Sequence, residues 1–434
     1  MSHRHHDILP KPAAALFTLA TLLLLAGCGS SDNSGVRLFN VSQDYTSLNV
    51  YVGSTATTPS IGNVPTGSLS SYVGIDPGSN TVYFTEGANT QSDPLTSQSE
   101  TFSTGEHRTY VAYGDTGGFA EHEIDEDQGA PGGGQASVEV LNSASDAGVL
   151  DVYLSSSGAP LGSVPPTFSG VAAGQTTSFS SVAAGTYELS ITGTGNESDV
   201  RLQIPSITLN SQEVVTIIVT ESAGGYLVNA YILPQQGSLT TELNPDARVR
   251  AVVGLATGSA VSATIGSTAL LSNAPADSVG TYQLVPAGTQ PVSVTVGGVS
   301  VSSPSQALAA GQDYTLLIYQ GASGPEENWL VDINRFPASS DASVRLVHAM
   351  AGLTDPISLS VDSVPVITDV SPSEASSYDT GVAASTTSAL SVIDATTSQQ
   401  LYSQSPVTLS SQGIYTLFMF GSASSPNGVL NQDR

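Results

Sequence analysis

Residues 136–154 read ASVEVLNSASDAGVLDVYL, and this stretch decides the fold because its pattern returns three more times along the chain. A run over residues 138–142 leads through a small polar turn into a second run of alternating apolar residues over 150–154. Alternation with a period of two is typical of half-buried β-strands. The first runs of the other copies begin at Val36, Val249 and Val344. The sequence therefore predicts four copies of one β-rich unit.

A threonine late in each copy fixes the length of the repeat. It lies inside a hydrophobic run each time, at Thr109, Thr216, Thr315 and Thr416, so that successive threonines are 107, 99 and 101 residues apart. This period is too long for solenoid or propeller repeats, which measure about 20–50 residues. Short alternating runs separated by turn signals, without sustained helical periodicity, predict an all-β fold of tandem immunoglobulin-like antiparallel β-sandwich domains.

Four sandwiches are expected, joined as independent beads, over residues 36–128, 136–235, 247–336 and 342–434. The linkers are rich in Gly, Pro and Ser, and residues 129–134 (GAPGGG) should form the loosest hinge. The last copy ends on GVLNQDR, where the earlier copies have a longer apolar run. Either its final strand is short, or an edge is left to pair with another chain.

The amino-terminal residues 1–27 read as a lipoprotein signal peptide rather than as part of a domain. Arg4 and Lys11 precede an apolar stretch that is too short to span a bilayer as a helix. The sequence LAGC that follows resembles the bacterial lipobox, in which the peptide is cleaved before the cysteine and the cysteine is lipidated. Cys28, the sole cysteine of the chain, is therefore the expected lipidation site. The alternative is an ordinary secretory signal with an incidental thiol.

Lipidation of Cys28 would make the membrane a partner, because acyl chains contribute about 0.8 kcal/mol per buried methylene group. Residues 28–35 read as a flexible tether. Gly29, rather than Asp, follows the cysteine, and by resemblance to enterobacterial sorting this favours the outer membrane. We expect a protein anchored to the cell outer membrane, either periplasmic or surface-exposed.

The charge of the chain is strongly acidic, with 37 Asp and Glu against 10 Lys and Arg and a formal net charge of -27. Nucleic acid would be repelled, since its binding depends on clustered Lys and Arg. A single cysteine allows no disulfide within the chain, so hydrophobic cores must hold each unit.

Two motifs carry a resemblance to a known family. The strand VRLVHA at residues 344–349, and SDA followed by LDVY between residues 145 and 153, resemble the domain of unknown function 4397 family. The resemblance covers most of residues 35–434; the third unit departs most from it, because it lacks Asp-Val-Tyr. It implies an extracytoplasmic β-sandwich, often in tandem and often lipid-anchored, and brings no assigned reaction or site.

The sequence offers no catalytic residues and implies no cofactor. The histidines after residue 28 have no metal-ligand spacing, and no Gly-x-Ser-x-Gly elbow occurs. The dense acidic run EHEIDED at residues 121–127 supplies weak calcium candidates, with a solvated charge run as the alternative interpretation. The candidates are Glu121, Glu123, Asp125 and Asp127.

Arginine recurs at one position of the first strand, as Arg37, Arg250 and Arg345, whereas the second unit has Glu139. On a strand of alternating apolar residues we interpret this arginine as structural, covering the sheet or pairing with an acid, rather than as part of a ligand surface. The expected function is that of a non-enzymatic, lipid-anchored cell-envelope protein with a structural, adhesive or scaffold role. The alternative is an envelope module that binds a ligand, either glycan or calcium. An envelope protein or a glycan is thus the expected partner besides the membrane.

Overall fold

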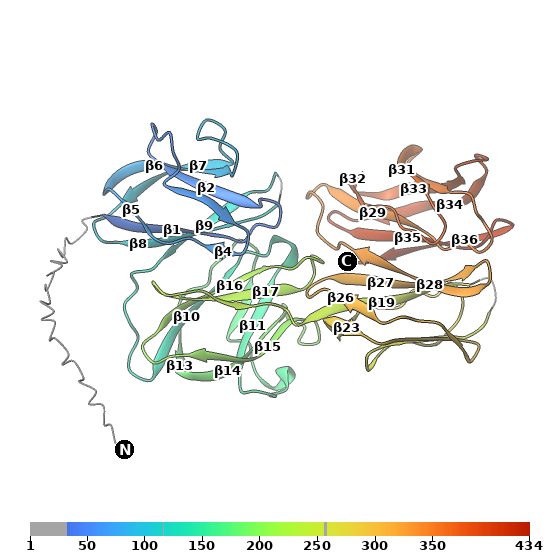
Figure 1. Ribbon diagram of the computed structural model, residues 1–434, viewed down its shortest axis with the longest axis horizontal. Helices are drawn as coiled ribbons and strands as arrows, with labels where there is room; N and C mark the ends of the chain where they lie inside the picture. The colour runs from blue at the N-terminus through green and yellow to red at the C-terminus, as the bar shows by residue number, and fades with distance from the viewer. Residues whose placement is uncertain (1–32, 116, 256–257) are drawn as a thin grey trace, which may run out of the picture.

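The computed structural model describes residues 33–115, 117–255 and 258–434. The expected signal peptide, Cys28 and most of the tether lie outside these residues. The described residues form 36 β-strands and two short 3-10 helices, so the predicted all-β, tandem-sandwich fold class is confirmed (Figure 1). Strands β1–β9 make up unit 1, β10–β18 unit 2, β19–β28 unit 3 and β29–β36 unit 4.

Unit 1 is a sandwich of two sheets. One has the order β4-β1-β8-β9, with β5 also pairing with β1, and the other has the order β3-β2-β6-β7. Its strands are β1 (Ser34–Asn40), β2 (Ser47–Val52), β3 (Ile61–Pro65), β4 (Ser68–Leu69), β5 (Val73–Ile75), β6 (Gly78–Glu86), β7 (Thr96–Phe102), β8 (His107–Tyr113) and β9 (Ala120–Asp125).

Unit 2 repeats this arrangement in the sheets β13-β10-β16-β17-β18 and β12-β11-β14-β15. Its elements are β10 (Gln135–Asn142), η1 (Ser145–Ala147), β11 (Leu150–Ser155), η2 (Leu161–Ser163), β12 (Phe168–Val171), β13 (Ser180–Ala183), β14 (Gly185–Gly193), β15 (Val200–Leu209), β16 (Val214–Glu221), β17 (Val228–Pro234) and β18 (Thr240–Glu242).

Unit 3 has the sheets β22-β19-β27-β28 and β21-β20-β24-β25, with an added pair, β23-β26. Its strands are β19 (Asp246–Gly254), β20 (Val261–Ile265), β21 (Thr268–Ala274), β22 (Gln283–Pro286), β23 (Gly288–Gln290), β24 (Val292–Val296), β25 (Val299–Val301), β26 (Gln306–Leu308), β27 (Asp313–Gly321) and β28 (Gly324–Asp332).

Unit 4 has the sheets β32-β29-β35-β36 and β31-β30-β33-β34. Its strands are β29 (Asp341–His348), β30 (Ile357–Val361), β31 (Val364–Val370), β32 (Asp379–Ala383), β33 (Ser385–Asp394), β34 (Gln400–Leu409), β35 (Ile414–Ser422) and β36 (Ser425–Gln432). The final strand is therefore not short. It pairs with β35 from Ser425 to Gln432. Its mostly polar sequence, SPNGVLNQ, lacks the apolar alternation by which a strand is recognised. Its outer side is a sheet edge, and pairing of that edge with another chain stays a prediction.

The sheets are antiparallel as predicted, except that one pair of strands in every unit is parallel. The first strand pairs with the strand that carries the marker threonine, in β1-β8, β10-β16, β19-β27 and β29-β35. A parallel pair needs a long connection, and here the strands of the second sheet supply it. In this register the recurring first-strand residue lies beside the threonine, as Arg37 beside Thr109 and Arg250 beside Thr315.

Each unit has its own hydrophobic core between its two sheets. The opposite face of the first-strand sheet is apolar as well, and it packs against the same face of a neighbouring unit. Phe39 and Val111 of unit 1 meet Leu141 and Ile218 of unit 2 in one buried cluster. A second buried cluster joins units 3 and 4, with members Val252, Leu317, Leu330, Val347, Ala349, Phe418 and Phe420.

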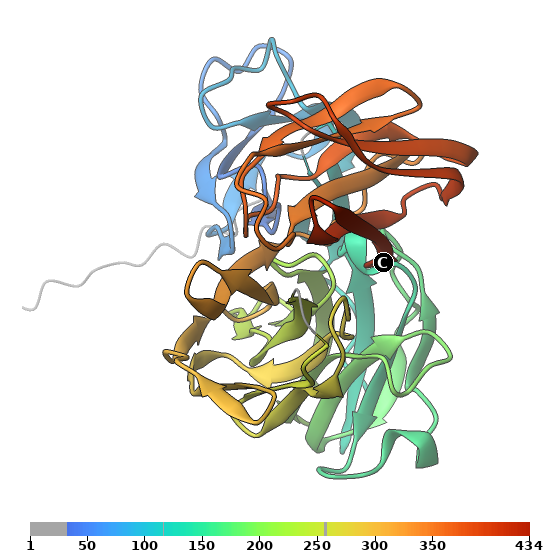
Figure 2. The ribbon, with the colours of Figure 1, turned by 90° about the vertical axis from the view of Figure 1, so that its right-hand side faces the viewer.

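The expectation of independent beads with a loose first hinge is therefore wrong. Units 1 and 2 form one face-to-face pair, units 3 and 4 form a second, and the two pairs lie side by side (Figures 1 and 2). The first strands are buried on both faces, as strands covered on both sides are. Backbones approach closely in this packing: a Cβ on Gly254 of unit 3 would lie 2.6 Å from the carbonyl oxygen of Ala349 of unit 4.

Candidate functional site

A buried polar group recurs in units 1, 3 and 4, on the face that packs against the neighbouring unit. In unit 1, Arg37 donates from Nε to Thr109 Oγ1 at 2.8 Å and from Nη2 to Glu126 Oε2 at 2.7 Å. Tyr72 donates its hydroxyl to the same carboxylate at 2.7 Å, and its ring lies 4.5 Å from the Arg37 guanidinium. The recurring arginine is paired with an acid, so its structural interpretation is confirmed.

Units 3 and 4 build the same group but exchange their arginines. Arg345 of unit 4 donates from Nη2 to Asp332 of unit 3 at 2.6 Å, whereas Arg250 of unit 3 donates from Nη1 to Asp433 of unit 4 at 2.5 Å. Each arginine still donates from Nε to the threonine of its own unit, at 2.9 Å. Both ion pairs are buried, with side-chain exposures of 0–1%.

The carboxylates of this exchange accept hydrogen bonds from several donors. Asp332 also accepts from the hydroxyls of Thr315 at 2.6 Å and Tyr282 at 2.5 Å. Burial acts to raise the pKa of Asp433, but the guanidiniums of Arg250 and Arg345 outweigh it and hold that pKa below its usual value. The exchange therefore holds units 3 and 4 together, because separating them would break two buried ion pairs at a large cost in free energy.

Unit 2 carries an altered version of the group, with Glu139, Phe179 and Gln235 at the positions of the arginine, tyrosine and acid. Thr216 donates to Glu139 at 2.8 Å, and burial raises the pKa of Glu139 to about 7. Arg37 of unit 1 reaches across instead, donating from Nη1 to the carbonyl of Gly237 at 2.8 Å. The pair of units 1 and 2 thus shares one arginine, where units 3 and 4 share two.

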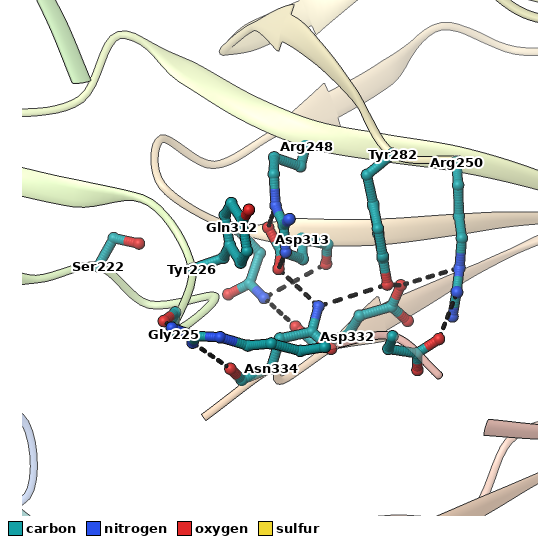
Figure 3. A network of polar contacts seen from close by, with 12 residues as sticks. Ser222, Gly225, Tyr226, Arg248, Arg250, Tyr282, Gln312, Asp313, Asp332 and Asn334 are labelled. Carbon is teal, nitrogen blue, oxygen red and sulfur yellow. Dashed lines mark hydrogen bonds and ion pairs between the residues drawn. The ribbon is translucent and has the colours of Figure 1, made fainter. Parts of the chain in front are cut away.

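The two pairs meet at a hydrogen-bonded junction, part of which Figure 3 shows. The turn after β16 lies against unit 3: Gly224 donates to the carbonyl of Gly311 and accepts from the backbone N–H of Asn334, both at 2.8 Å. Gly225 adopts a φ of +83°, and a Cβ there would lie 2.7 Å from the backbone nitrogen of Arg335. Only glycine fits this approach without displacement.

From the junction a chain of polar contacts runs into unit 3 (Figure 3). Arg248 donates from Nε to Asp313 Oδ1 at 2.9 Å, and the same carboxylate accepts from Asn334 at 2.6 Å. The Arg248 guanidinium also lies 3.6 Å from the ring centroid of Tyr226 of unit 2. This contact between a cation and an aromatic face joins unit 2 to unit 3.

A cavity of about 790 Å³ opens beside this chain, between units 2, 3 and 4; we call it the junction cavity. Four of the eight arginines in the described ranges line it: Arg201, Arg248, Arg250 and Arg434. Its carboxylates are those of Asp199 and Asp433. Neutral polar side chains complete much of its wall, namely Thr194, Asn196, Thr281, Asn431 and Gln432.

Arg434 is the guanidinium of the cavity without a carboxylate partner among the side chains described. It donates from Nη1 to the carbonyls of Gly225 at 2.7 Å and Asn334 at 2.9 Å, and from Nη2 to the carbonyl of Asp146. Burial, followed by repulsion from Arg201, lowers the pKa of Arg434 to about 10.

Three carboxylates gather on the other side of Arg434. Asp115 of unit 1 and Asp146 and Glu221 of unit 2 can place one oxygen each within 4.8 Å of the others. Burial and then the charge of Glu221 raise the pKa of Asp115 to about 6 and that of Asp146 to about 7. Arg335, 3.7 Å from Asp115, supplies a neighbouring positive charge. No pattern in the sequence indicates this cluster, because its members come from two units and are not adjacent along the chain.

The four calcium candidates lie along β9 and just beyond it. Glu123 pairs with Arg108 at 3.0 Å, and Asp127 accepts from the backbone N–H of His107 at 2.6 Å. Asp125 accepts from the backbone N–H of Asp127 at 2.9 Å, whereas burial raises the pKa of Glu121. Calcium binding by these residues stays a prediction.

The fold and its contacts define a class: a tandem β-sandwich repeat protein whose units pack in pairs. More particularly, the chain belongs to the domain of unknown function family DUF4397, whose family model matches residues 34–153 and 247–354, just over half of the chain. The predicted family is confirmed. The matches cover units 1 and 3 and extend into the first strands of units 2 and 4. They therefore include unit 3, which departs most from the family motif because it lacks Asp-Val-Tyr. A search of curated proteins found no match.

Within the described ranges, no helix has the length and apolar character needed to cross a membrane.

Proposed function

We propose that this protein is a non-enzymatic scaffold of the cell envelope, anchored by lipid on Cys28 and presenting two packed pairs of sandwiches as one stiff body. The observation that carries the proposal is the packing between units. Two buried apolar clusters, two exchanged ion pairs and the glycine turn at the junction all join different units.

These contacts favour a scaffold over a flexible spacer. Phe418 and Phe420 point away from the core of their own unit, yet both are fully buried against unit 3. Burying such a side chain contributes about 1.5–3 kcal/mol. A spacer needs no fixed angle between its units, whereas a scaffold that positions a partner does.

Solution scattering tests the stiffness of the ectodomain. A compact chain of this size should have a radius of gyration near 21 Å, somewhat more for two pairs side by side, against roughly 40 Å for four units in a line. The measurement uses the soluble Cys28→Ala protein after removal of its leader. A value near that of a linear array would contradict the scaffold proposal.

The anchor is tested separately by fractionation. Cys28→Ala should move the protein from the membrane fraction to the soluble fraction, because the acyl chains have no other attachment point in the chain. Ser30→Ala, which leaves the thiol in place, should stay with the membrane. Firm attachment of the Cys28→Ala protein would remove the lipid anchor from the proposal, and retention of a Gly29→Asp protein on the inner membrane would support outer-membrane sorting of the natural sequence.

A further inference from the structure

We propose that the junction cavity binds a carboxylate-bearing saccharide, with the guanidiniums of Arg248 and Arg434 receiving the carboxylate. This assigns a ligand to the protein and goes beyond its role as a scaffold. The chain has 37 acidic residues against 10 basic ones, so arginines gathered around one opening are an unusual concentration of positive charge.

The arginines of the cavity have donors to spare. Arg248 donates hydrogen bonds from Nε and Nη2 to Asp313. Among the hydrogen bonds of the described residues, none has Arg248 Nη1 as its donor. Arg250 is 99% buried, and its Nη2 atom is shielded from solvent and has no hydrogen-bond partner within the described chain. The Nη1 atom of Arg248 is therefore the donor that a ligand in the cavity would pair with, because Arg250 Nη2 is shielded from the cavity as well as from solvent.

Three of the four cavity arginines form ion pairs, whereas the hydrogen bonds of Arg434 go to carbonyl groups and the carboxylate of Asp146 lies nearby. Arg201 has Asp199 at 2.7 Å, Arg250 has Asp433 at 2.5 Å, and Arg248 has Asp313. The partners of Arg434 are three carbonyl groups, which accept its hydrogen bonds but do not neutralise it. A guanidinium matches the planar fork of a carboxylate, so a carboxylate ligand would add charge-assisted hydrogen bonds at the cavity wall.

The shape and the remaining wall of the cavity favour a saccharide as the body of the ligand. Its volume of about 790 Å³ lies within the usual range of small-molecule sites, about 300–1,000 Å³. Thr281 and Gln432 are exposed on its wall and offer neutral donors and acceptors for hydroxyl groups. Guanidiniums already cover the rings of Tyr226 and Phe336, at 3.6 and 3.9 Å, so hydrogen bonds rather than ring stacking must recognise the sugar.

Titration calorimetry with a uronic-acid disaccharide tests the proposal, with a neutral disaccharide of the same size and inorganic phosphate as comparison ligands. The uronic acid should bind, and rising salt should weaken its binding. The neutral sugar should bind at least about tenfold more weakly, because it leaves the guanidiniums unpaired. Phosphate should compete but bind more weakly, because it cannot use the neutral wall.

Two substitutions separate the role of charge from damage to the fold. Thr281→Asp adds a carboxylate at the exposed wall and should weaken uronic-acid binding at least about tenfold, since the added carboxylate repels that of the ligand. Thr281→Asn, of the same shape but neutral, should bind within about twofold of the natural protein. Arg434→Gln should weaken binding more strongly, and its thermal melt shows whether the junction survives.

The outcomes distinguish the possibilities. No binding of the uronic acid, equal binding of the neutral sugar, or equal losses for Thr281→Asp and Thr281→Asn would overturn the anion site. Phosphate binding as tight as that of the uronic acid would overturn the saccharide part. None of these results changes the scattering of the unliganded protein, so the scaffold proposal fails or stands on its own experiment.

Discussion

Removing the guanidinium of Arg345 tests whether exchanged charges hold units 3 and 4 together. In Arg345→Met the side chain keeps most of its length and apolar contact, but Asp332 loses its 2.6 Å partner. The two side chains are 1% and 0% exposed, so water cannot replace the lost contact without entering the interface.

The expected loss is large. Breaking a buried ion pair from one side costs about 3–5 kcal/mol, because the other charge is left buried. Thr315 and Tyr282 still donate to Asp332, which places the estimate at the lower end of that range. For a cooperative pair of about 200 residues, a loss of about 3 kcal/mol lowers Tm by roughly 6–12 °C.

Urea unfolding measures the loss, with fluorescence of Trp329 in β28 as the probe, since it is the sole tryptophan of the chain. A double-mutant cycle adds Asp332→Asn and the double variant, and the coupling energy should exceed about 1.5 kcal/mol. The control is Glu100→Gln at the partly exposed ion pair with Arg108; because this pair lies in unit 1, its unfolding is followed by circular dichroism, and the variant should cost less than about 1 kcal/mol. A cost for Arg345→Met no larger than this control, or an additive cycle, would refute the reasoning.

Three further predictions follow from single features. Glu139→Gln should raise the free energy of unfolding by about 1–3 kcal/mol at pH 8 and have little effect at pH 4. The pKa of Glu139 in the folded protein is about 7, above its ordinary value of 4.5. The protein is therefore most stable with respect to this carboxyl below pH 4.5, and that stability is lost as the pH rises through 7. A gain in the urea melts of Glu139→Gln that does not depend on pH would contradict this. Phe418→Ala should lower the free energy of unfolding by about 3–5 kcal/mol in urea melts, because Phe418 is buried between units 3 and 4. The control Val299→Ala, at a side chain that is 71% exposed, should lower it by less than about 0.5 kcal/mol. Equal losses would mean that the cluster between units 3 and 4 is not packed. Gly225→Ala should loosen the junction and raise the radius of gyration, whereas Gly105→Ala, with a similar φ of +75° but open space at its Cβ, should leave the radius unchanged.

The fold of each unit was predictable because its signals are local. Alternating runs, glycine turns and the spacing of the marker threonines each report on a few neighbouring residues. The parallel register was also present in the sequence, since Arg37 and Thr109 recur together as Arg250 and Thr315. The final strand escaped notice because its residues are mostly polar at an edge, where burial imposes little apolar pattern.

The packing of units in pairs was not predictable from these signals. An outward apolar side chain such as Phe418 looks the same in a strand whether it faces another unit or a loop of its own unit. The exchanged ion pair joins residues 183 positions apart, and no periodicity connects them. The junction cavity was missed for the same reason, because its arginines come from three units and only Arg250 belongs to the recurring set.

The exchange of Arg250 and Asp433 has a consequence for the order in which the chain is made. At about 5–20 residues per second, a ribosome adds Asp433 some 10–40 s after Arg250. For that interval a newly emerged third sandwich has Arg250 without Asp433 and Asp332 without Arg345, and its face bearing Leu317 is uncovered. Units 3 and 4 should therefore mature in a single late step, and a nascent chain halted between them is the form most in need of a chaperone.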